Sequence, residues 1–219
     1  MVEKGTINVQ GTGVVKVDPD LVVLSLEIKV LHDSYGEAVA ALNHRVACLR
    51  DDLVLDGIQK SDLKTTDFDI SAKYLREKLE DYTSKEIFVG FAASHSLKLE
   101  IPLDTPRLNS ILMNIVRGRS EATFSIDFAV KDTARLQREV LAAAVRQAKA
   151  NATVMAEAAG VSLGRVQRID YSWKEVRFSS ETIYSMPDET STMQAMPDLE
   201  PDSIECSENV TVQWEIVQE

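Results

Sequence analysis

The chain has 219 residues, 44% of them hydrophobic, which is enough for one large domain, or two small ones packed together, with a real core. Its formal net charge of -11 argues against a nucleic-acid partner, because phosphate binding needs a basic surface. Two cysteines are too few for a disulfide framework, and no stretch approaches the roughly 18 apolar residues that span a bilayer. The first residues contain no apolar signal segment, so the chain as written is expected in the cytoplasm, or in the periplasm or cell envelope if a signal was trimmed.

The negative charge is concentrated near the C-terminus. Residues 178–219 hold ten of the 35 acidic residues and no Lys or Arg. A solvated, solubilising segment is the simplest interpretation, because charge of a single sign usually serves solubility. The alternative is an electrostatic contact with basic residues of a neighbouring subunit, namely Arg135, Arg138, Arg146 and Lys149.

The N-terminal residues predict two strands. The run at 6–17 is rich in β-formers, residues 18–20 supply turn chemistry, and a second run follows at 21–31. Every second residue from Val22 to Val30 is apolar, whereas the residues between them are mostly polar. We therefore expect a β-hairpin whose sheet is covered on one side.

A helix is predicted next, from Ser34 to Gly57. Ser34 and Glu37 form a capping box, apolar residues then recur at helical spacing, and Gly57 offers a C-terminal stop. Two further strands, at 65–74 and 87–101, are expected to form a second hairpin joined by a charged, mobile connection.

The second half of the chain begins with a short helix, for which Thr105 is the predicted N-cap and Pro106 lies in the first turn. A strand follows at 122–130, and then a long, Ala-rich helix at 132–159. The buried stripe predicted for this helix consists of Leu141, Val145, Ala148, Ala152, Met155 and Ala159.

The last strands are predicted at 166–178 and 206–217. Between them, residues 179–203 contain three prolines and three methionines and are predicted to form a mobile loop. Such long loops are often functional or disordered, and the methionines would allow this one to order against a partner subunit.

The fold class that follows is α+β, a two-layer sandwich with antiparallel sheets. Residues 1–103 are expected to form a ββαββ half, and residues 104–219 an αβαββ half built around the Ala-rich helix. We treat residues 1–219 as a single domain.

The order of these segments and their local sequences resemble the SIMPL family, long catalogued as a domain of unknown function. The matching parts are GTGVVKVDPDLVVLSLEI, EAVAALNHRVACL, DGIQKSDLKTTDFDI, VGFAASHSLKLEI and VLAAAVRQAKANATVMAEAAGVSLGRV, which together span nearly the whole chain. The resemblance implies the same α+β fold. It also implies that some bacterial relatives are periplasmic immunogenic or oxidative-stress defence proteins, or assemble into large rings. It supplies no catalytic residues.

Gly11 and Gly13 form a G-x-G pattern. A dinucleotide-binding loop must open a helix, but here a strand continues. We therefore interpret these glycines as sites where the strand bends or another backbone approaches closely.

A metal site is conceivable at Asp67 and Asp69, which share one face of a strand and could approach His95 through the hairpin. The alternation of the strand opposes it. Phe68 and Ile70 are expected to face the core, which turns both aspartates outward, whereas His95 should turn inward unless a bulge intervenes. We predict no metal site.

Other polar residues have structural interpretations. Asp18 and Asp20 are interpreted as turn residues in preference to an acid/base pair. The histidines, His32, His44 and His95, accompany no nucleophile motif.

Cys48 is expected to be a packed thiol rather than a redox sensor, although Arg45 and Arg50 lie near it in sequence. Asn151 and Asn209 begin glycosylation patterns that matter only in an exported protein. No catalytic, cofactor-binding or metal-binding residue is therefore predicted, and no cofactor.

These observations favour a non-enzymatic protein that acts through self-association, as an oligomeric scaffold in stress protection. A monomeric or dimeric binding module for a ligand or an unknown protein partner, with residues 179–203 as its lid, is the alternative. The third possibility is a metal-dependent enzyme, for which Asp67 and Asp69 are the candidate site residues.

Overall fold

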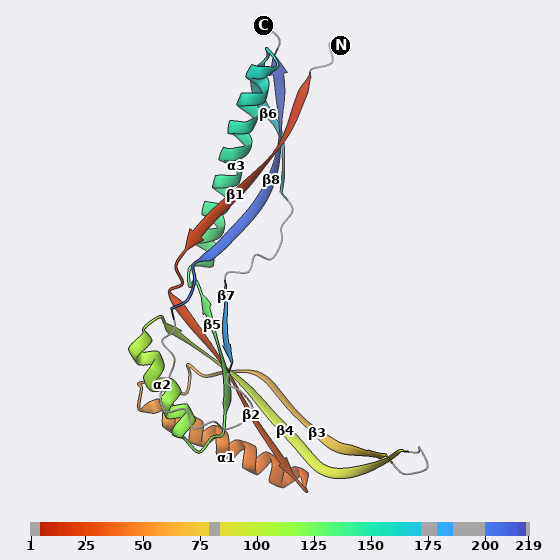
Figure 1. The fold of residues 1–219 in the computed structure, drawn as a ribbon, viewed down its shortest axis with the longest axis vertical. Coiled ribbons are helices and arrows are strands. Elements are labelled where there is room, and N and C mark those ends of the chain that lie inside the picture. The colour runs from red at the N-terminus through yellow and green to blue at the C-terminus, as the bar shows by residue number, and fades with distance from the viewer. Residues whose placement is uncertain (1–4, 79–83, 172–178, 186–199, 218–219) are drawn as a thin grey trace. The chain divides into compact units, whose positions relative to one another are not determined.

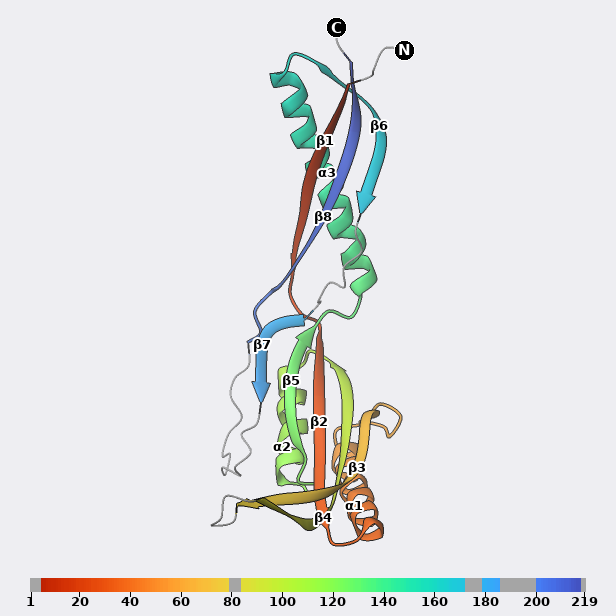
Figure 2. The same ribbon diagram turned by 90° about the vertical axis from the view of Figure 1, so that its right-hand side faces the viewer.

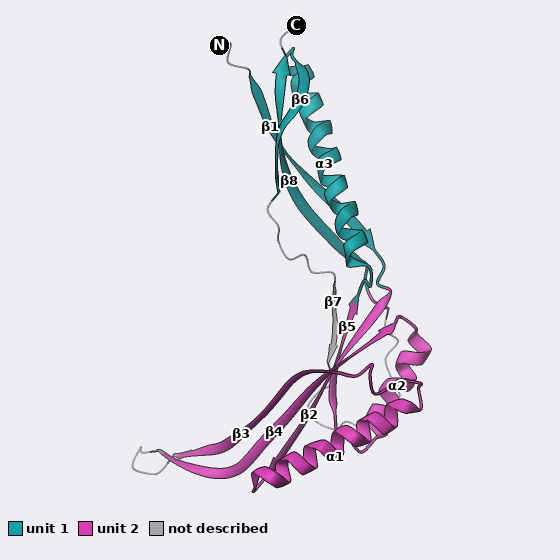
Figure 3. Ribbon diagram, turned by 180° about the vertical axis from the view of Figure 1, so that it is seen from behind, with its two compact units in different colours: residues 1–19, 129–181, 202–219 teal, residues 20–128, 182–201 magenta. Residues whose placement is uncertain are grey.

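The structure is a computed structural model that describes residues 5–78, 84–171, 179–185 and 200–217. Its helices and antiparallel strand pairs confirm the α+β class (Figure 1). The chain divides into two compact units that interleave along the sequence, coloured separately in Figure 3. Unit 1 comprises residues 1–19, 129–181 and 202–219, and unit 2 comprises residues 20–128 and 182–201.

Unit 1 is a three-stranded sheet packed against one long helix. Its strands are β1 (Thr6–Val17), β8 (Ile204–Val217) and β6 (Ser162–Tyr171), in the order β1-β8-β6. The helix α3 (Thr133–Ala158) lies along one face of this sheet, as Figure 2 shows. Its core joins small helix residues to larger strand residues, namely Ala144, Ala148, Ala152, Val9, Val210, Val212 and Trp214.

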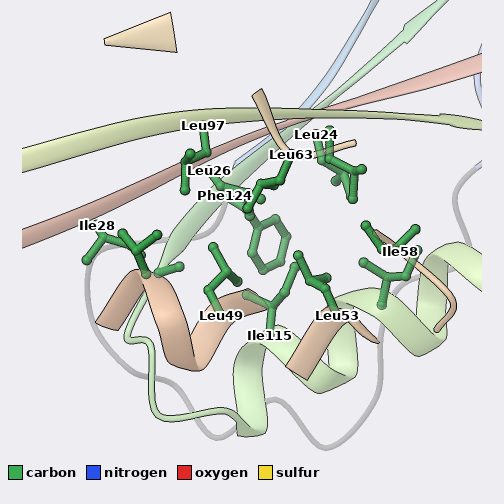
Figure 4. Close-up of a cluster of buried hydrophobic side chains, with 14 of the residues drawn as sticks. Leu24, Leu26, Ile28, Leu49, Leu53, Ile58, Leu63, Leu97, Ile115 and Phe124 are labelled. Atoms are coloured by element: carbon green, nitrogen blue, oxygen red, sulfur yellow. The ribbon is translucent and has the colours of Figure 1, made fainter. Parts of the chain in front are cut away.

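Unit 2 is a five-stranded sheet covered on one face by two helices. The sheet order is β3-β4-β2-β5-β7, where β2 is Leu21–His32, β3 is Lys64–Lys78, β4 is Ser84–Pro102, β5 is Thr123–Ala129 and β7 is Ser179–Ser185. The helices α1 (Tyr35–Val54) and α2 (Thr105–Arg117) supply one side of the core. In Figure 4 the ring of Phe124 lies among Leu49, Leu53 and Ile115.

Several local predictions are confirmed. Ser34 caps α1 by accepting a hydrogen bond from the backbone N–H of Glu37, and Ile28 and the other even-numbered residues from Val22 to Val30 are buried. The second hairpin exists, because β3 and β4 pair antiparallel. The N-cap of α2 is Asp104 rather than Thr105, since its carboxylate accepts from the N–H of Arg107.

The predicted hairpin between the first two strands is wrong. β1 pairs antiparallel with β8 along its whole length, from Thr6 opposite Glu215 to Val17 opposite Ile204. β2 instead pairs with β4 in the other sheet. Residues 18–20 form no turn between the two strands, and long-range burial decides which strands pair.

The buried stripe predicted for α3 is also partly wrong. The helix buries Leu136, Val140, Ala144, Ala148, Ala152 and Ala156, whereas Val145 and Met155 are 37% and 52% exposed. The reason lies in β1, where a Cβ on Gly11 or Gly13 would collide with the α3 backbone at Ala144. The helix therefore turns its small residues to the sheet, and the close-approach interpretation of the two glycines is confirmed.

The predicted mobile loop at 179–203 contains a strand. Residues 179–185 form β7, which extends the five-stranded sheet beside β5. Residues 186–199 lie outside the described residues, as do residues 172–178 of the predicted strand at 166–178. The described part of that strand belongs to β6, which begins earlier, at Ser162.

Candidate interaction site: the β3–β4 arm

The most distinctive surface of unit 2 is a two-stranded extension of its sheet, which we call the arm. It consists of residues 72–78 of β3 and 84–91 of β4. β2 ends opposite Phe91, so before that residue β4 has, among the strands that the structure describes, β3 as its one neighbour. Figure 1 shows the two strands continuing beyond the end of β2.

A bulge begins the arm. The register between β3 and β4 shifts between Lys73 and Tyr74, which leaves Val89 as the extra residue on β4. The adjacent Gly90 has φ +130, and a Cβ there would meet the backbone carbonyl of His32. A glycine is therefore required where the pair of strands leaves the sheet.

Both faces of the arm expose large apolar side chains. Tyr74 lies opposite Phe88 and Leu75 lies opposite Ile87, and these four side chains are 55%, 46%, 59% and 40% exposed. Because successive residues of a strand point to opposite faces, the Tyr74 pair occupies one face and the Leu75 pair the other. A free strand pair with two apolar faces suits burial between protein surfaces rather than contact with water.

The aromatic face continues onto the sheet as a row of rings. The ring centroids of Tyr74 and Phe88 are 5.6 Å apart, those of Phe88 and Phe91 5.4 Å, and those of Phe91 and Tyr35 of α1 6.0 Å. All three contacts are edge-on, the geometry that aromatic pairs prefer. The row therefore joins the arm to α1 through ring contacts.

The charges of the arm compensate one another across the strands. Arg76 lies opposite Glu86, and Glu77 lies opposite Lys85. Opposite charges in facing positions stabilise an antiparallel pair modestly. These four residues cancel, and Lys73 and Lys78 leave the arm a small positive excess within a chain whose net charge is -11.

The structure keeps apart the three residues that were considered, and rejected, as a metal site. Asp67 and Asp69 lie opposite Ser96 and Ser94, on the other face of the sheet from His95, which lies opposite Phe68. The outward direction of both aspartates agrees with the prediction, and Phe68, opposite His95, lies on the helix-covered face but is 50% exposed on an outer strand. Among the described residues, no group of three or more His, Cys, Asp or Glu side chains is arranged to hold a metal ion.

His95 has a mixed environment on the helix-covered face. Its Nε2 lies 2.9 Å from the Thr65 hydroxyl, and the Phe68 ring packs edge-on at 5.5 Å. Nδ1 of His95 and Nε of Arg50 are buried without a hydrogen-bond partner in the described part of the chain. Burial, and then the charge of Arg50, lower the pKa of His95 below its usual value.

This lowered pKa predicts a pH dependence of stability. Below about pH 6.5 the histidine is protonated in the unfolded chain but stays neutral in the folded protein, because its folded pKa is lower. The free energy of unfolding therefore decreases as the pH is lowered, until the pH is below the folded pKa. His95→Gln should lack this loss, and its stability relative to the wild type should therefore rise as the pH falls. Urea unfolding of both proteins from about pH 8 to about pH 5 measures the difference, and a constant difference would contradict the lowered pKa.

Other predicted residues have structural contacts. Cys48 is buried, and its Sγ lies 3.8 Å from Nε2 of His44. Asp18 and Asp20, which follow β1 in the sequence and precede β2, are exposed. Asn209 accepts a hydrogen bond from the Thr12 hydroxyl at 2.7 Å. Asn151 and His32 are exposed.

The acidic C-terminal segment is not simply a solvated tail. Its last described part is β8, the central strand of unit 1. Glu205 pairs with Lys16 at 3.0 Å, Glu215 pairs with Arg165 at 3.1 Å, and Glu208 is only 5% exposed. Arg135, one of the basic residues expected to meet this segment across a subunit boundary, pairs with Glu139 of its own helix.

Sequence reasoning missed the arm. It treated residues 76–86 as a charged, mobile connection because their polarity hides the pairing. The available signal was the mirrored arrangement of Tyr74-Leu75 and Ile87-Phe88 at equal distances from the centre of that connection. Equal spacing of this kind is what an extended antiparallel hairpin requires.

Taken together, the two sheet units and the exposed arm define an α+β protein whose candidate site is a contact surface. Residues 7–214 match the family model SIMPL, described as a protein of unknown function (DUF541), and the chain belongs to this family. It is 27% identical over 163 residues to the "26 kDa periplasmic immunogenic protein" of Brucella abortus (strain S19) and 26% identical to the protein of the same name from Brucella melitensis biotype 1. Each match covers 74% of this chain and 65% of the relative, so just under two thirds of those proteins is matched. In the described part of the chain, no helix is long and apolar enough to cross a membrane.

Proposed function

We propose that this protein acts through self-association, as a scaffold assembled from copies of the same chain. The observation that carries the proposal is the arm, whose two faces expose Tyr74, Leu75, Ile87 and Phe88. Aromatic and large aliphatic side chains of this kind form the buried centres of protein interfaces.

A second copy is the occupant that the charges favour. The whole chain carries a net charge of -11, so two copies repel each other over most of their surface. The arm carries little of this negative charge, because Arg76 faces Glu86, Glu77 faces Lys85, and Lys73 and Lys78 leave a small positive excess. Copies can therefore approach most easily where the apolar side chains are.

The proposal predicts that polar arms abolish assembly. The double variants Tyr74→Ser/Phe88→Ser and Leu75→Ser/Ile87→Ser each remove the apolar surface of one face, and loss of large interface anchors typically costs about 2 kcal/mol or more per residue. Sedimentation velocity should show the wild type as a particle heavier than one chain and both variants shifted towards the single chain.

Val154→Ser is the matched control, because Val154 is an exposed apolar residue on α3, outside the arm. This variant should sediment like the wild type. A wild-type protein that sediments as a single chain at all concentrations would contradict self-association.

A binding module is the second candidate. A hollow of about 520 Å³ lies on the open face of the unit 2 sheet and is lined by Lys29, Leu31, Asp69, Ser71, Lys73 and Ser94, among others. Its size suits a small ligand. The proposed lid, residues 179–203, is β7 in its first part and lies outside the described residues at 186–199.

A metal-dependent enzyme has less support, because Asp67 and Asp69 face away from His95.

The name of the relatives places those proteins in the periplasm, and fractionation of cells that produce the full gene product tests whether this protein shares that location.

Stress protection is the physiological part of the proposal. A strain without the protein should survive peroxide less well, and a gene with the polar arms should fail to restore survival.

A further inference from the structure

His95 is contacted by the start of β3, the outer strand of the five-stranded sheet. Its Nε2 lies 2.9 Å from the Thr65 hydroxyl, and the Phe68 ring packs edge-on against its ring. Thr65 and Phe68 are three positions apart, so in a regular strand they would point to opposite faces of the sheet. The register shift between Thr65 and Asp67, which leaves Thr66 as the extra residue, brings both side chains to the same face. The bulge therefore directs two side chains of this strand end to one histidine.

The surroundings of His95 do not suit a protonated ring. A protonated histidine carries an N–H on both ring nitrogens, and each needs an acceptor when it is buried. Nε2 has the Thr65 hydroxyl, but Nδ1 is buried with no partner among the described residues, and so is Nε of Arg50 on α1. The charge that acts on His95 is that of Arg50, which has the same sign as a protonated ring.

The other charged groups of the adjacent strands do not offset such a charge. The residue of β2 opposite His95 is the apolar Ile28. The charged side chains of β2, β3 and β4 near this position belong to the other face of the sheet, namely Glu27, Lys29, Lys64, Asp67, Asp69 and Lys98.

The other charged residues of α1 near Arg50 also have different surroundings. Arg45 forms an ion pair with Glu121 at 2.8 Å, and the carboxylate of Asp52 lies against Gly118. Asp51 is exposed. Protonation of His95 therefore places a second positive charge beside Arg50 with no acceptor for its Nδ1 proton.

We propose that the start of β3, residues 64–69, is an acid-sensitive cover over His95 that detaches from β4 when this histidine takes up a proton. Detachment exposes the ring to water, which supplies the missing acceptor. This strand end is the part that yields, because all of its residues are exposed and β4 is its one neighbour among the strands that the structure describes. The proposal does not depend on self-association, since the arm begins only at residue 72.

The lowered pKa of His95 sets the direction and the pH range of this response. Below about pH 6.5 the ring is protonated when the cover is open but stays neutral when it is closed. Opening therefore becomes more favourable as the pH falls, by up to about tenfold per pH unit, until the pH is below the pKa of the closed state. Above about pH 6.5 this group should not affect opening.

Hydrogen exchange of the intact protein tests the cover, with protection factors corrected for the intrinsic effect of pH. The amides of residues 64–69 that bond to β4 should lose protection between about pH 7 and about pH 5. At the lower pH their protection should be weaker than that of the β2 amides and change little with low concentrations of urea, as a local opening requires. Unchanged protection, or protection equal to that of β2 with the same urea dependence, would overturn the proposal.

Arg50→Gln tests the neighbouring charge. Without this cation the closed cover resists protonation of His95 less, so the acid-induced loss of protection at residues 64–69 should become smaller. Burial of the ring remains, so the loss should not disappear. A loss as large as that of the wild type would overturn the part assigned to Arg50.

His95→Gln tests the titrating group itself. The amide can still bond to the Thr65 hydroxyl but takes up no proton, so the protection of residues 64–69 should no longer depend on pH in this range. His32→Gln is the matched control, because His32 is exposed and this variant should respond as the wild type does. In an NMR titration of the wild type, the His95 ring should protonate at lower pH than the rings of the exposed His32 and His44. A cover that still opens in acid after His95→Gln would contradict the proposal.

Discussion

Gly13→Ala is expected to destabilise unit 1 by about 3 kcal/mol or more, the upper end for overpacking a core. A Cβ at this position would collide with the carbonyl oxygen of Val140 and the amide nitrogen of Ala144. Both are backbone atoms of α3, so no side-chain rotation can relieve the contact. β1 and α3 would have to separate, which also loosens the packing of Ala144 against the sheet.

Denaturant unfolding followed by tryptophan fluorescence measures this loss, because Trp214 belongs to the core of unit 1. Gly36→Ala is the control. It lies in the first turn of α1 with nothing within 4 Å of its position for a Cβ, so the stability should stay the same or rise by up to about 1 kcal/mol. An unfolding midpoint of Gly13→Ala equal to the wild type would refute the close approach of β1 and α3.

Phe124→Ala is expected to cost unit 2 about 3 to 5 kcal/mol, the usual range for removing a buried aromatic ring. The ring is 4% exposed, and it fills the space between α1, α2 and the sheet (Figure 4). Because Leu49, Leu53 and Ile115 come from two different helices, the cavity left behind can close only if both helices shift.

Hydrogen exchange of the β2 and β4 amides, together with urea unfolding, measures this effect in unit 2. The neighbouring Ser125→Ala is the control, since that side chain points to the other face of β5 and should change stability by less than about 0.5 kcal/mol. Similar losses for the two variants would contradict the burial of Phe124.

The local structure of this chain could be predicted because its signals lie within a few residues. Three of these signals act within one element or one hairpin: the capping box of Ser34 and Glu37, the alternation in β2, and the spacing of β3 and β4. The register argument that separated Asp67 and Asp69 from His95 worked for the same reason. The fold class and the family follow from these local elements and their order.

The sequence by itself therefore determined where most helices and strands form, whereas only the tertiary structure decided which of them meet. β1 and β8 lie at opposite ends of the chain, and no local pattern distinguishes that pairing from a hairpin with β2. In α3 alanines occur on several faces, so periodicity could not choose the buried one until Gly11 and Gly13 selected it by their lack of a side chain. The arm likewise depends on a bulge at Val89 and a glycine at position 90, where two strands pass the end of β2, and its apolar side chains remain exposed there.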